Sequence, residues 1–170
     1  LPFCIHTRYS TQQAIQEDIV ASLYAQGMRK LIILSGHGGN NFKGMIRDLA
    51  FVYPDFLIIA ADWFSIVPPK DYFEAVVDDH AGESETSVMM HYHPELVNLA
   101  EAGDGESQPF AIPSLNEKVG WAPRHWDKAT VDSGVGNPKK ASAEKGERYM
   151  KPVVEKLAKL FTEVGLGSLY

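Results

Sequence analysis

The chain has 170 residues, of which 45% are hydrophobic and 22% charged, and these are the proportions of one ordinary globular domain. Lys and Arg number 16 against 22 Asp and Glu, which gives a formal net charge of −6. Because no basic tract is present, neither nucleic acid nor an anionic membrane is expected as a partner. No apolar run approaches the roughly 18 residues that a membrane span needs.

The cysteine content and the first residues bear on the compartment. A single cysteine, Cys4, cannot form an internal disulfide, and this is typical of a reducing compartment. Residues 1–20 contain no cationic start followed by a long apolar stretch, so no secretory signal is evident. The sequence therefore predicts a cytoplasmic location.

The first predicted elements are a helix and a strand. Residues 10–25 carry apolar side chains at helical spacing, with Ser10 and Gln13 as a capping box and Gly27 as the stop. Residues 30–35 contain four branched apolar side chains in succession, which is typical of a buried strand.

A second helix and a second strand follow. Asn40 or Asn41 is expected to cap the helix, and Pro54 to end it. Its inward side is expected to carry five hydrophobic side chains, those of Phe42, Met45, Ile46, Leu49 and Phe51. Residues 56–64 form the second buried strand. The alternation of helix and strand predicts an α/β fold with a mainly parallel sheet, in a single domain over residues 1–170.

The later part of the chain is less regular. A helix is expected to begin near Ser84, and residues 101–140 form a long loop rich in Gly, Pro, Ser and Asp. A loop of that length usually covers a site or packs against a partner. Residues 141–164 are again helical, with Pro152 either kinking one helix or opening a second.

The first candidate functional motif is Gly36-His37-Gly38-Gly39-Asn40, directly after the strand at residues 30–35. The glycines allow a tight turn and a close approach by another group. A histidine at the carboxyl end of a buried strand lies where open α/β sheets bind their ligands. His37 is therefore the first candidate site residue.

The second candidate cluster is the run of residues 78–87. Its first eight residues hold one imidazole, that of His80, and four carboxylates. Imidazole and carboxylate together suit a divalent ion such as zinc, manganese or iron. The alternative is structural: Ser84 caps a helix, and Glu83 and Glu85 face its positive N-terminus. The residues alone favour neither explanation.

Other candidate residues carry weaker signals. If their segment is helical, His91 and His93 point about 200° apart and do not chelate one ion. His6 and His125 are lone histidines in irregular segments and are expected to be solvated. Four aromatic residues lie in or beside loops, and each is a candidate pocket wall or, by default, a core packing residue: Trp63, Tyr72, Trp121 and Trp126. No Gly-x-Ser-x-Gly elbow and no phosphate-binding loop is present, which argues against serine hydrolases and nucleotide-binding proteins.

Three motifs in order resemble the creatininase (creatinine amidohydrolase) family. They are the Gly-His-Gly-Gly-Asn motif, the run of residues 79–87, and Ala-Ser-Ala-Glu-Lys-Gly at residues 141–146. The resemblance implies a three-layer α/β/α fold, a dinuclear metal centre of zinc, with manganese or iron as alternatives, and a homo-oligomer, often a hexamer. Members of the creatininase family hydrolyse amides through a metal-bound hydroxide.

The resemblance also implies roles for particular residues. His37 corresponds to a metal ligand, and Glu85 is the candidate carboxylate for the second metal, with Glu83 as the alternative. His80 corresponds to the active-site histidine of the family, which binds substrate or donates a proton to the leaving nitrogen. His80 and Glu83 are therefore the predicted catalytic residues.

The sequence departs from the family pattern in two ways. The Glu-x-His segment and the metal-bridging Asp that precede the first helix in the family have no match, so the chain resembles the C-terminal two-thirds of the domain. Creatininase itself has bulkier and acidic residues at Gly38 and Gly39, and a Trp in place of Val76-Val77. These differences argue against creatinine as the substrate.

Three functional hypotheses follow. The first is a metal-dependent amidohydrolase that acts on a small amide, cyclic amide or formamide, a non-peptide C–N bond. The second is a catalytically inactive oligomerisation or interaction module of the same fold. The third is a peptide-processing hydrolase on the same scaffold.

Overall fold

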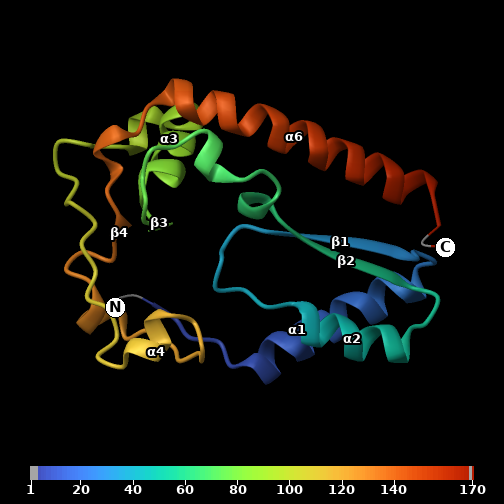
Figure 1. Ribbon diagram of the computed structural model, residues 1–170. Coiled ribbons are helices and arrows are strands. Elements are labelled where there is room, and N and C mark those ends of the chain that lie inside the picture. Colours follow the sequence, from blue (N-terminus) through green and yellow to red (C-terminus); the bar gives the residue numbers. More distant parts are fainter. Residues whose placement is uncertain (1–3, 169) are drawn as a thin grey trace. The chain divides into compact units, whose positions relative to one another are not determined.

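The computed structural model describes residues 4–168 and 170, and its helices and strands are shown in Figure 1. The chain divides into two compact units. The sheet unit comprises Pro2–Val67 and Val153–Tyr170, and the ribbon unit comprises Pro68–Pro152. Each unit is described by itself, and the single domain expected over residues 1–170 stays a prediction.

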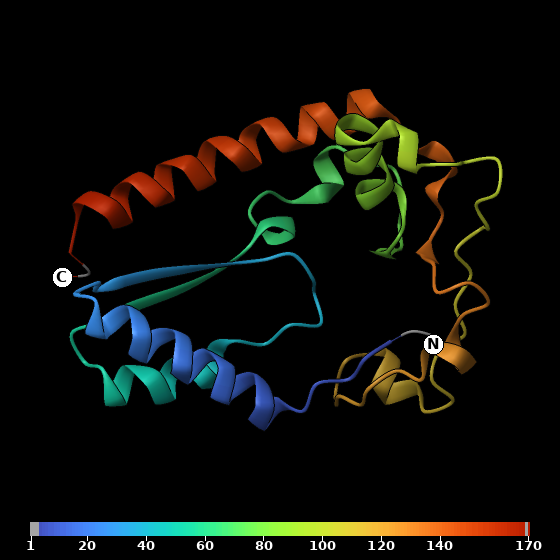
Figure 2. The ribbon, with the colours of Figure 1, turned by 180° about the vertical axis from the view of Figure 1, so that it is seen from behind.

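The sheet unit has the predicted alternation of helix and strand. Its elements are α1 (Tyr9–Ala25), β1 (Lys30–Ser35), α2 (Lys43–Val52) and β2 (Leu57–Asp62). The two strands are parallel and in register from the Lys30–Leu57 pair to the Ser35–Asp62 pair. In Figures 1 and 2, α1 and α2 lie on the same side of this strand pair. The parallel pairing confirms an α/β fold.

The core of the sheet unit is formed by α1, α2 and the strands. Val20, Leu49, Phe56 and Ile58 are buried there. Partly buried side chains surround them, namely Leu23, Tyr24, Leu31, Ile33, Ile46 and Tyr53. Burial of this kind stabilises the fold by about 25 cal/mol for each Å² of apolar surface removed from water. The expectation that Phe51 faces inward is wrong, since its side chain is 90% exposed.

The helix ends differ in part from the sequence expectation. The helix α1 begins at Tyr9 with Arg8 as its N-cap residue and no side-chain cap, so Ser10 lies inside the helix and the predicted capping box is wrong. Gly27 follows the helix with φ +87°, as expected of a stop signal. Asn41 accepts a hydrogen bond from the Lys43 backbone N–H at 3.3 Å, next to the N-cap residue Phe42 of α2.

The ribbon unit is built around a short antiparallel pair of strands. β3 (Asp78–His80) pairs with β4 (Val135–Gly136), with an irregularity in register between Asp78 and His80. The helices of this unit are α3 (Glu83–Tyr92), α4 (Pro113–Asn116), α5 (Trp126–Ala129) and the first part of α6 (Ala143–Leu166). Three short 3-10 turns connect them, at Pro69–Asp71, Pro94–Leu96 and Pro138–Lys140.

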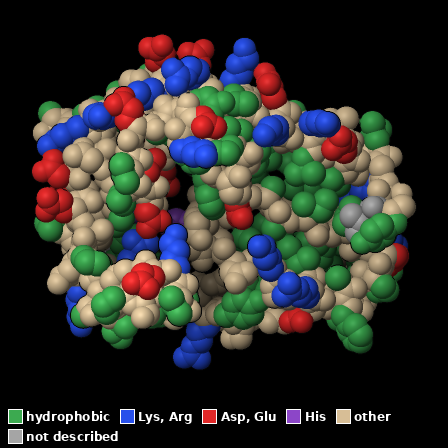
Figure 3. Space-filling view, in the orientation of Figure 1, with side chains coloured by type: hydrophobic (Ala, Val, Ile, Leu, Met, Phe, Trp, Pro, Cys, Tyr) green, Lys and Arg blue, Asp and Glu red, His purple; other side chains and the backbone are tan. Residues whose placement is uncertain are grey.

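α6 is a single 24-residue helix that contains Pro152, so Pro152 does not open a second helix. Its outer surface carries basic and acidic side chains close to one another (Figure 3). In the sheet unit, Lys30 Nζ donates hydrogen bonds to the carbonyl oxygens of Val164, Gly165 and Gly167 at the end of this helix. A cation is favourable at that position because helix C-termini carry partial negative charge. No helix of the described residues combines the length and apolar character of a membrane span.

Close packing joins α3 to α6 within the ribbon unit. A Cβ atom added to Gly146 would lie 2.1 Å from the Ser87 backbone oxygen, so only glycine fits at this approach. Ser87 is buried, and its Oγ accepts a hydrogen bond from the Ser142 backbone N–H at 3.1 Å. Tyr149 is also buried and packs edge-on against Tyr72, at a ring-centroid distance of 5.4 Å.

Candidate functional site

His37 lies in the sheet unit, on the exposed loop just beyond the carboxyl end of β1. Its Nδ1 accepts a hydrogen bond from the Gly39 backbone N–H at 2.9 Å, and its carbonyl oxygen accepts one from the Asn40 N–H at 3.1 Å. These bonds fold the Gly-His-Gly-Gly segment back on itself. The structure thus places His37 at the predicted edge of the sheet.

Asp62 was not singled out by the sequence analysis. It is the last residue of β2 and the register partner of Ser35 at the end of β1. Adjacent strands lie about 4.8 Å apart, so a carboxylate at Asp62 belongs to the same sheet edge as the His37 loop. The signal that identifies it is an acidic residue at the end of an apolar strand.

His80 and Glu85 lie together in the ribbon unit, where β3 turns into α3. Ala81 has φ +51°, a left-handed conformation that is uncommon for a residue with a side chain. Its backbone N–H donates a 2.6 Å hydrogen bond to Glu85 Oε2, and His80 Nδ1 lies 4.0 Å from the same oxygen. Both side chains are partly exposed, His80 at 35% and Glu85 at 41%. This turn therefore presents an imidazole and a carboxylate next to one another.

An aromatic and a cationic side chain flank His80. The Trp126 ring at the start of α5 lies 5.1 Å from the His80 ring, at a tilt of 62°. The Arg124 guanidinium lies 4.7 Å over the Trp126 ring and also forms an ion pair with Asp79. A cation over an indole face contributes about 0.5–1 kcal/mol at a partly exposed position. Trp126 is thus a wall beside His80, and Arg124 holds that wall in place.

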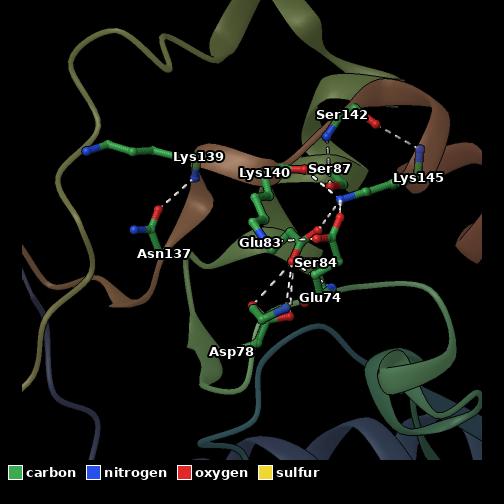
Figure 4. Close-up of polar contacts among 11 residues, drawn as sticks. Glu74, Asp78, Glu83, Ser84, Ser87, Asn137, Lys139, Lys140, Ser142 and Lys145 are labelled. Carbon is green, nitrogen blue, oxygen red and sulfur yellow. Dashed lines mark hydrogen bonds and ion pairs between the residues drawn. The ribbon is translucent and has the colours of Figure 1, made fainter.

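Glu83 has a different environment from Glu85. Its side chain is fully buried, and Oε2 accepts hydrogen bonds from the backbone N–H groups of Glu74 and Ala75 at 2.9 and 2.8 Å. Its Oε1 pairs with Lys145 Nζ at 2.5 Å (Figure 4). Both oxygens thus join α3 to the 74–75 segment and to α6. The predicted catalytic role of Glu83 stays a prediction.

Lys145 connects Glu83 to a second carboxylate, that of Glu74 (Figure 4). The hydrogen bonds that Lys140 and Lys145 donate to Glu74 lower its pKa to about 2. The hydrogen bond to Glu83 raises the pKa of Lys145 above its ordinary value. The four side chains form an ion cluster, defined here as Glu74, Glu83, Lys140 and Lys145.

The start of α3 is not capped by Ser84, although the structural explanation of residues 78–87 predicted this cap. Gly82 is the N-cap residue, and Ser84 lies inside the helix, so the expectation of a Ser84 cap is wrong. The Asp78 carboxylate instead accepts hydrogen bonds from the Ser84 backbone N–H at 3.1 and 3.3 Å. Burial raises the pKa of Asp78, and the hydrogen bonds from Ser84 oppose that shift. Glu83 and Glu85 do lie in the first turn, where the helix dipole favours them.

The donor chemistry fits zinc only in part. Zinc usually binds imidazole nitrogen and carboxylate oxygen. His37 and His80 supply imidazoles, and Glu85 supplies a carboxylate. Across residues 4–168 and 170, however, no group of three His, Cys, Asp or Glu side chains gathers into a metal site. His37 belongs to the sheet unit and Glu85 to the ribbon unit, and the arrangement of these two units is not determined.

The remaining histidines are His6, His91, His93 and His125. His91 packs against Tyr92 at a ring-centroid distance of 4.6 Å, and His93 is exposed and pairs with Glu95 at 3.3 Å. His6 and His125 are exposed, as the sequence predicts.

The chain combines an α/β fold with a Gly-His-Gly-Gly loop and a His-Ala-Gly-Glu turn, and it is similar to known proteins of one family. The family model described as creatininase, creatinine amidohydrolase, matches residues 1–161. The chain therefore belongs to the creatininase family.

Individual proteins agree with this assignment. A crystal structure of a putative creatinine amidohydrolase from Bacteroides fragilis is 82% identical, with a TM-score of 0.97, and the match covers all of this chain and 67% of that one. A mutant creatininase of the zinc–zinc type is 23% identical, with a TM-score of 0.75, and the match covers 96% of this chain and 67% of that one. These matches confirm the predicted creatininase-like fold.

A curated relative is named for a different activity, that of a peptidase. A mycofactocin precursor peptide peptidase from Mycobacterium ulcerans is 32% identical over 131 residues, which is 74% of this chain. The chain spans 45% of the length of that relative, which is less than half.

Proposed function

We propose that the protein is a metal-dependent hydrolase of the creatininase family that cleaves a C–N bond in a small amide, cyclic amide or formamide. The observation that carries the proposal is the pairing of His80 with Glu85, 4.0 Å apart and partly exposed at the start of α3. Family membership supports the reaction class, because the family model is described as creatinine amidohydrolase.

The proposal assigns His37, in the sheet unit, and Glu85, in the ribbon unit, each as a ligand of a divalent metal, most simply zinc. A related mutant creatininase is of the zinc–zinc type, which supports that choice. When bound, the metal would supply an activated water and polarise the amide carbonyl. A homo-oligomer, hexameric by resemblance to the family, and a cytoplasmic location complete the proposal.

His80 is the proton donor in this proposal. An imidazole nitrogen can hold and release a proton, and the His80 ring is partly exposed, so it is suited to deliver a proton to the leaving nitrogen. Trp126 packs against one side of the ring and restricts its orientation, and the Glu85 carboxylate lies 4.0 Å from His80 Nδ1. Loss of a positioned proton donor typically lowers turnover by about 10²–10⁴.

A second candidate is a peptide-processing hydrolase on the same scaffold. The curated relative from Mycobacterium ulcerans is named as a peptidase that acts on the mycofactocin precursor peptide. The two candidates share the chemistry of amide hydrolysis and differ in the size of the substrate.

The test is the variant His80→Ala in the full-length protein, with His93→Ala as the matched control. His93 is an exposed histidine at the end of α3, ten or more residues from the turn that carries His80. We expect H80A to retain most of its metal and to lose turnover by about 10²–10⁴ on an amide panel. H93A should match the wild type in both metal content and turnover.

Metal content, melting temperature and turnover measured on one preparation separate the explanations. Near-wild-type turnover of H80A with intact metal would remove His80 from the mechanism. Loss of metal in step with activity would make His80 a ligand. A wild-type protein that binds metal but hydrolyses no amide or peptide would overturn the proposed function.

A further inference from the structure

A pocket of about 350 Å³ adjoins the His80–Glu85 turn inside the ribbon unit. Glu85 and Thr86 contribute to its wall, so it begins at the carboxylate of the candidate site. Its volume falls within the range of about 300–1,000 Å³ that is usual for small-molecule sites. The pocket is therefore continuous with the candidate site and not a separate feature of the surface.

The geometry of α3 explains the direction of the pocket. Glu85 and Met89 are four residues apart, so their side chains lie one above the other on the same face of the helix. The pocket extends from the polar side chains in the first turn to Met89 in the second. A molecule that reaches Glu85 thus has a path along an increasingly apolar helix face.

The segment after α3 supplies a further wall, which is mostly apolar and includes Asn98. Its pocket-lining side chains include Leu96, Val97, Leu99 and Ala102. Backbone hydrogen bonds fix the segment in consecutive turns, from Glu101 N–H to the Asn98 carbonyl at 3.2 Å and from Ala102 N–H to the Leu99 carbonyl at 3.3 Å. The Asn98 side chain accepts a further bond from the Ala100 N–H at 3.2 Å. These hydrogen bonds hold the segment that forms this wall in a defined conformation.

We infer that this pocket is a subsite for an apolar substituent of the substrate, of the size of a leucine side chain. Seven of the ten residues that line the pocket are apolar, and the three polar ones are Glu85, Thr86 and Asn98; the amide would lie at the Glu85 end. Burial of such a substituent is favourable by about 0.8 kcal/mol for each CH₂ group. The substrate class is therefore an amide of an apolar amino acid or a short peptide. A compact polar amide has no apolar substituent and would leave the pocket unfilled.

This inference rests on the proposed function, because it places the scissile amide at His80 and Glu85. The reaction is ordinary hydrolysis: water adds to the carbonyl carbon, the C–N bond breaks, and the nitrogen leaves with the added proton. Leucinamide and glycinamide are suitable probes, since each yields its amino acid and ammonia and they differ only in the side chain.

The experiment compares the two amides with the full-length, zinc-loaded protein. We expect kcat/KM for leucinamide to exceed that for glycinamide by about tenfold or more, as is usual for a hydrophobic pocket. The variant Ala102→Phe fills the pocket and should abolish that preference. Ala100→Phe is the matched control, because Ala100 is exposed on the same segment and does not line the pocket.

A second variant and a second readout keep the outcomes distinct. Leu96→Gln makes the wall polar at a position that is 69% exposed, so it serves if A102F does not fold. Binding of both amides to the metal-free protein by titration calorimetry separates the subsite from catalysis. Preferential leucinamide binding without hydrolysis would support the subsite and contradict the proposed function. Equal kcat/KM and equal binding for the two amides, or an equal effect of A102F and A100F, would overturn the subsite.

Discussion

Glu83 and Glu85 lie two positions apart on α3, and their surroundings assign them different tasks. Glu83 is buried with partners on both oxygens, and Glu85 is partly exposed with one oxygen bound to the Ala81 N–H. Removal of a buried carboxylate destabilises the fold because its buried partners are then left without an acceptor. A partly exposed carboxylate beside His80 remains available to a ligand.

The first prediction concerns Glu83→Gln. A glutamine side chain has one oxygen where Glu83 uses two, so one set of buried partners loses its acceptor. We expect the free energy of unfolding to fall by about 1–3 kcal/mol in urea denaturation. Glu85→Gln is the control and should change it by no more than about 0.5 kcal/mol. Equal stability of E83Q and E85Q would contradict the structural role of Glu83.

The sequence predicted part of this difference and not the rest. Proximity of His80 and Glu85 follows from local spacing, because both lie at one strand-to-helix turn. The burial of Glu83 depends on Lys145, which is 62 positions later in the chain. The neighbourhood of Trp126 and His80 likewise arises from a loop that has no periodic pattern. Such contacts between distant segments leave no signal in spacing.

At the scale of elements, the approach of α3 to α6 sets a second prediction. Gly146→Ala places a methyl group within 2.1 Å of the Ser87 backbone oxygen unless the helices separate. We expect a loss of about 1–3 kcal/mol in the free energy of unfolding, the usual cost of overpacking.

The matched control for this change is Gly165→Ala in the same helix. A Cβ atom at Gly165 meets no atom within 4 Å. Alanine there should be neutral or stabilise the helix by up to about 1 kcal/mol, because glycine is the poorer helix former. A G146A protein as stable as G165A would show that the two helices do not pack as described.

The third prediction uses the ion cluster that joins the 74–75 segment to α6. The folded-state pKa of Glu74 is lowered from 4.5 to about 2, so its pairing stabilises the fold above pH 4.5 and is lost as the pH falls toward 2. We expect Glu74→Gln to lower the melting temperature at pH 7 and to match the wild type near pH 2. Because Glu74 is exposed, added salt should reduce the difference at pH 7. A difference that grows as the pH falls would contradict this assignment.

The elements themselves were largely predictable. β1 matches the expected residues 30–35 because an uninterrupted apolar run is bounded by Gly36. β2 ends at Asp62, two residues before the expected end, since Trp63–Ser65 forms a 3-10 turn. Helix caps were less predictable, because a helix start shifted by one or two residues places Ser10 and Ser84 inside the helices instead of at their N-caps.

At the scale of the whole molecule, the two residues proposed as metal ligands belong to different units. His37 follows β1 in the sheet unit, and Glu85 begins α3 in the ribbon unit. The described residues gather no group of three donors, whereas catalytic zinc sites generally have three protein ligands. The fourth prediction is that the 170-residue chain alone binds zinc weakly in competition with a chelating dye. Tight, stoichiometric binding of two zinc ions by this chain would contradict it.

The most direct test of the proposed site is the zinc content of the full-length protein and three variants, measured after gel filtration. His37→Ala and Glu85→Gln are expected to lose at least half of the bound zinc, because each removes a proposed ligand. His93→Ala is expected to retain the wild-type content, since His93 is an exposed histidine paired with Glu95. Wild-type zinc content in both H37A and E85Q would contradict the proposed metal centre.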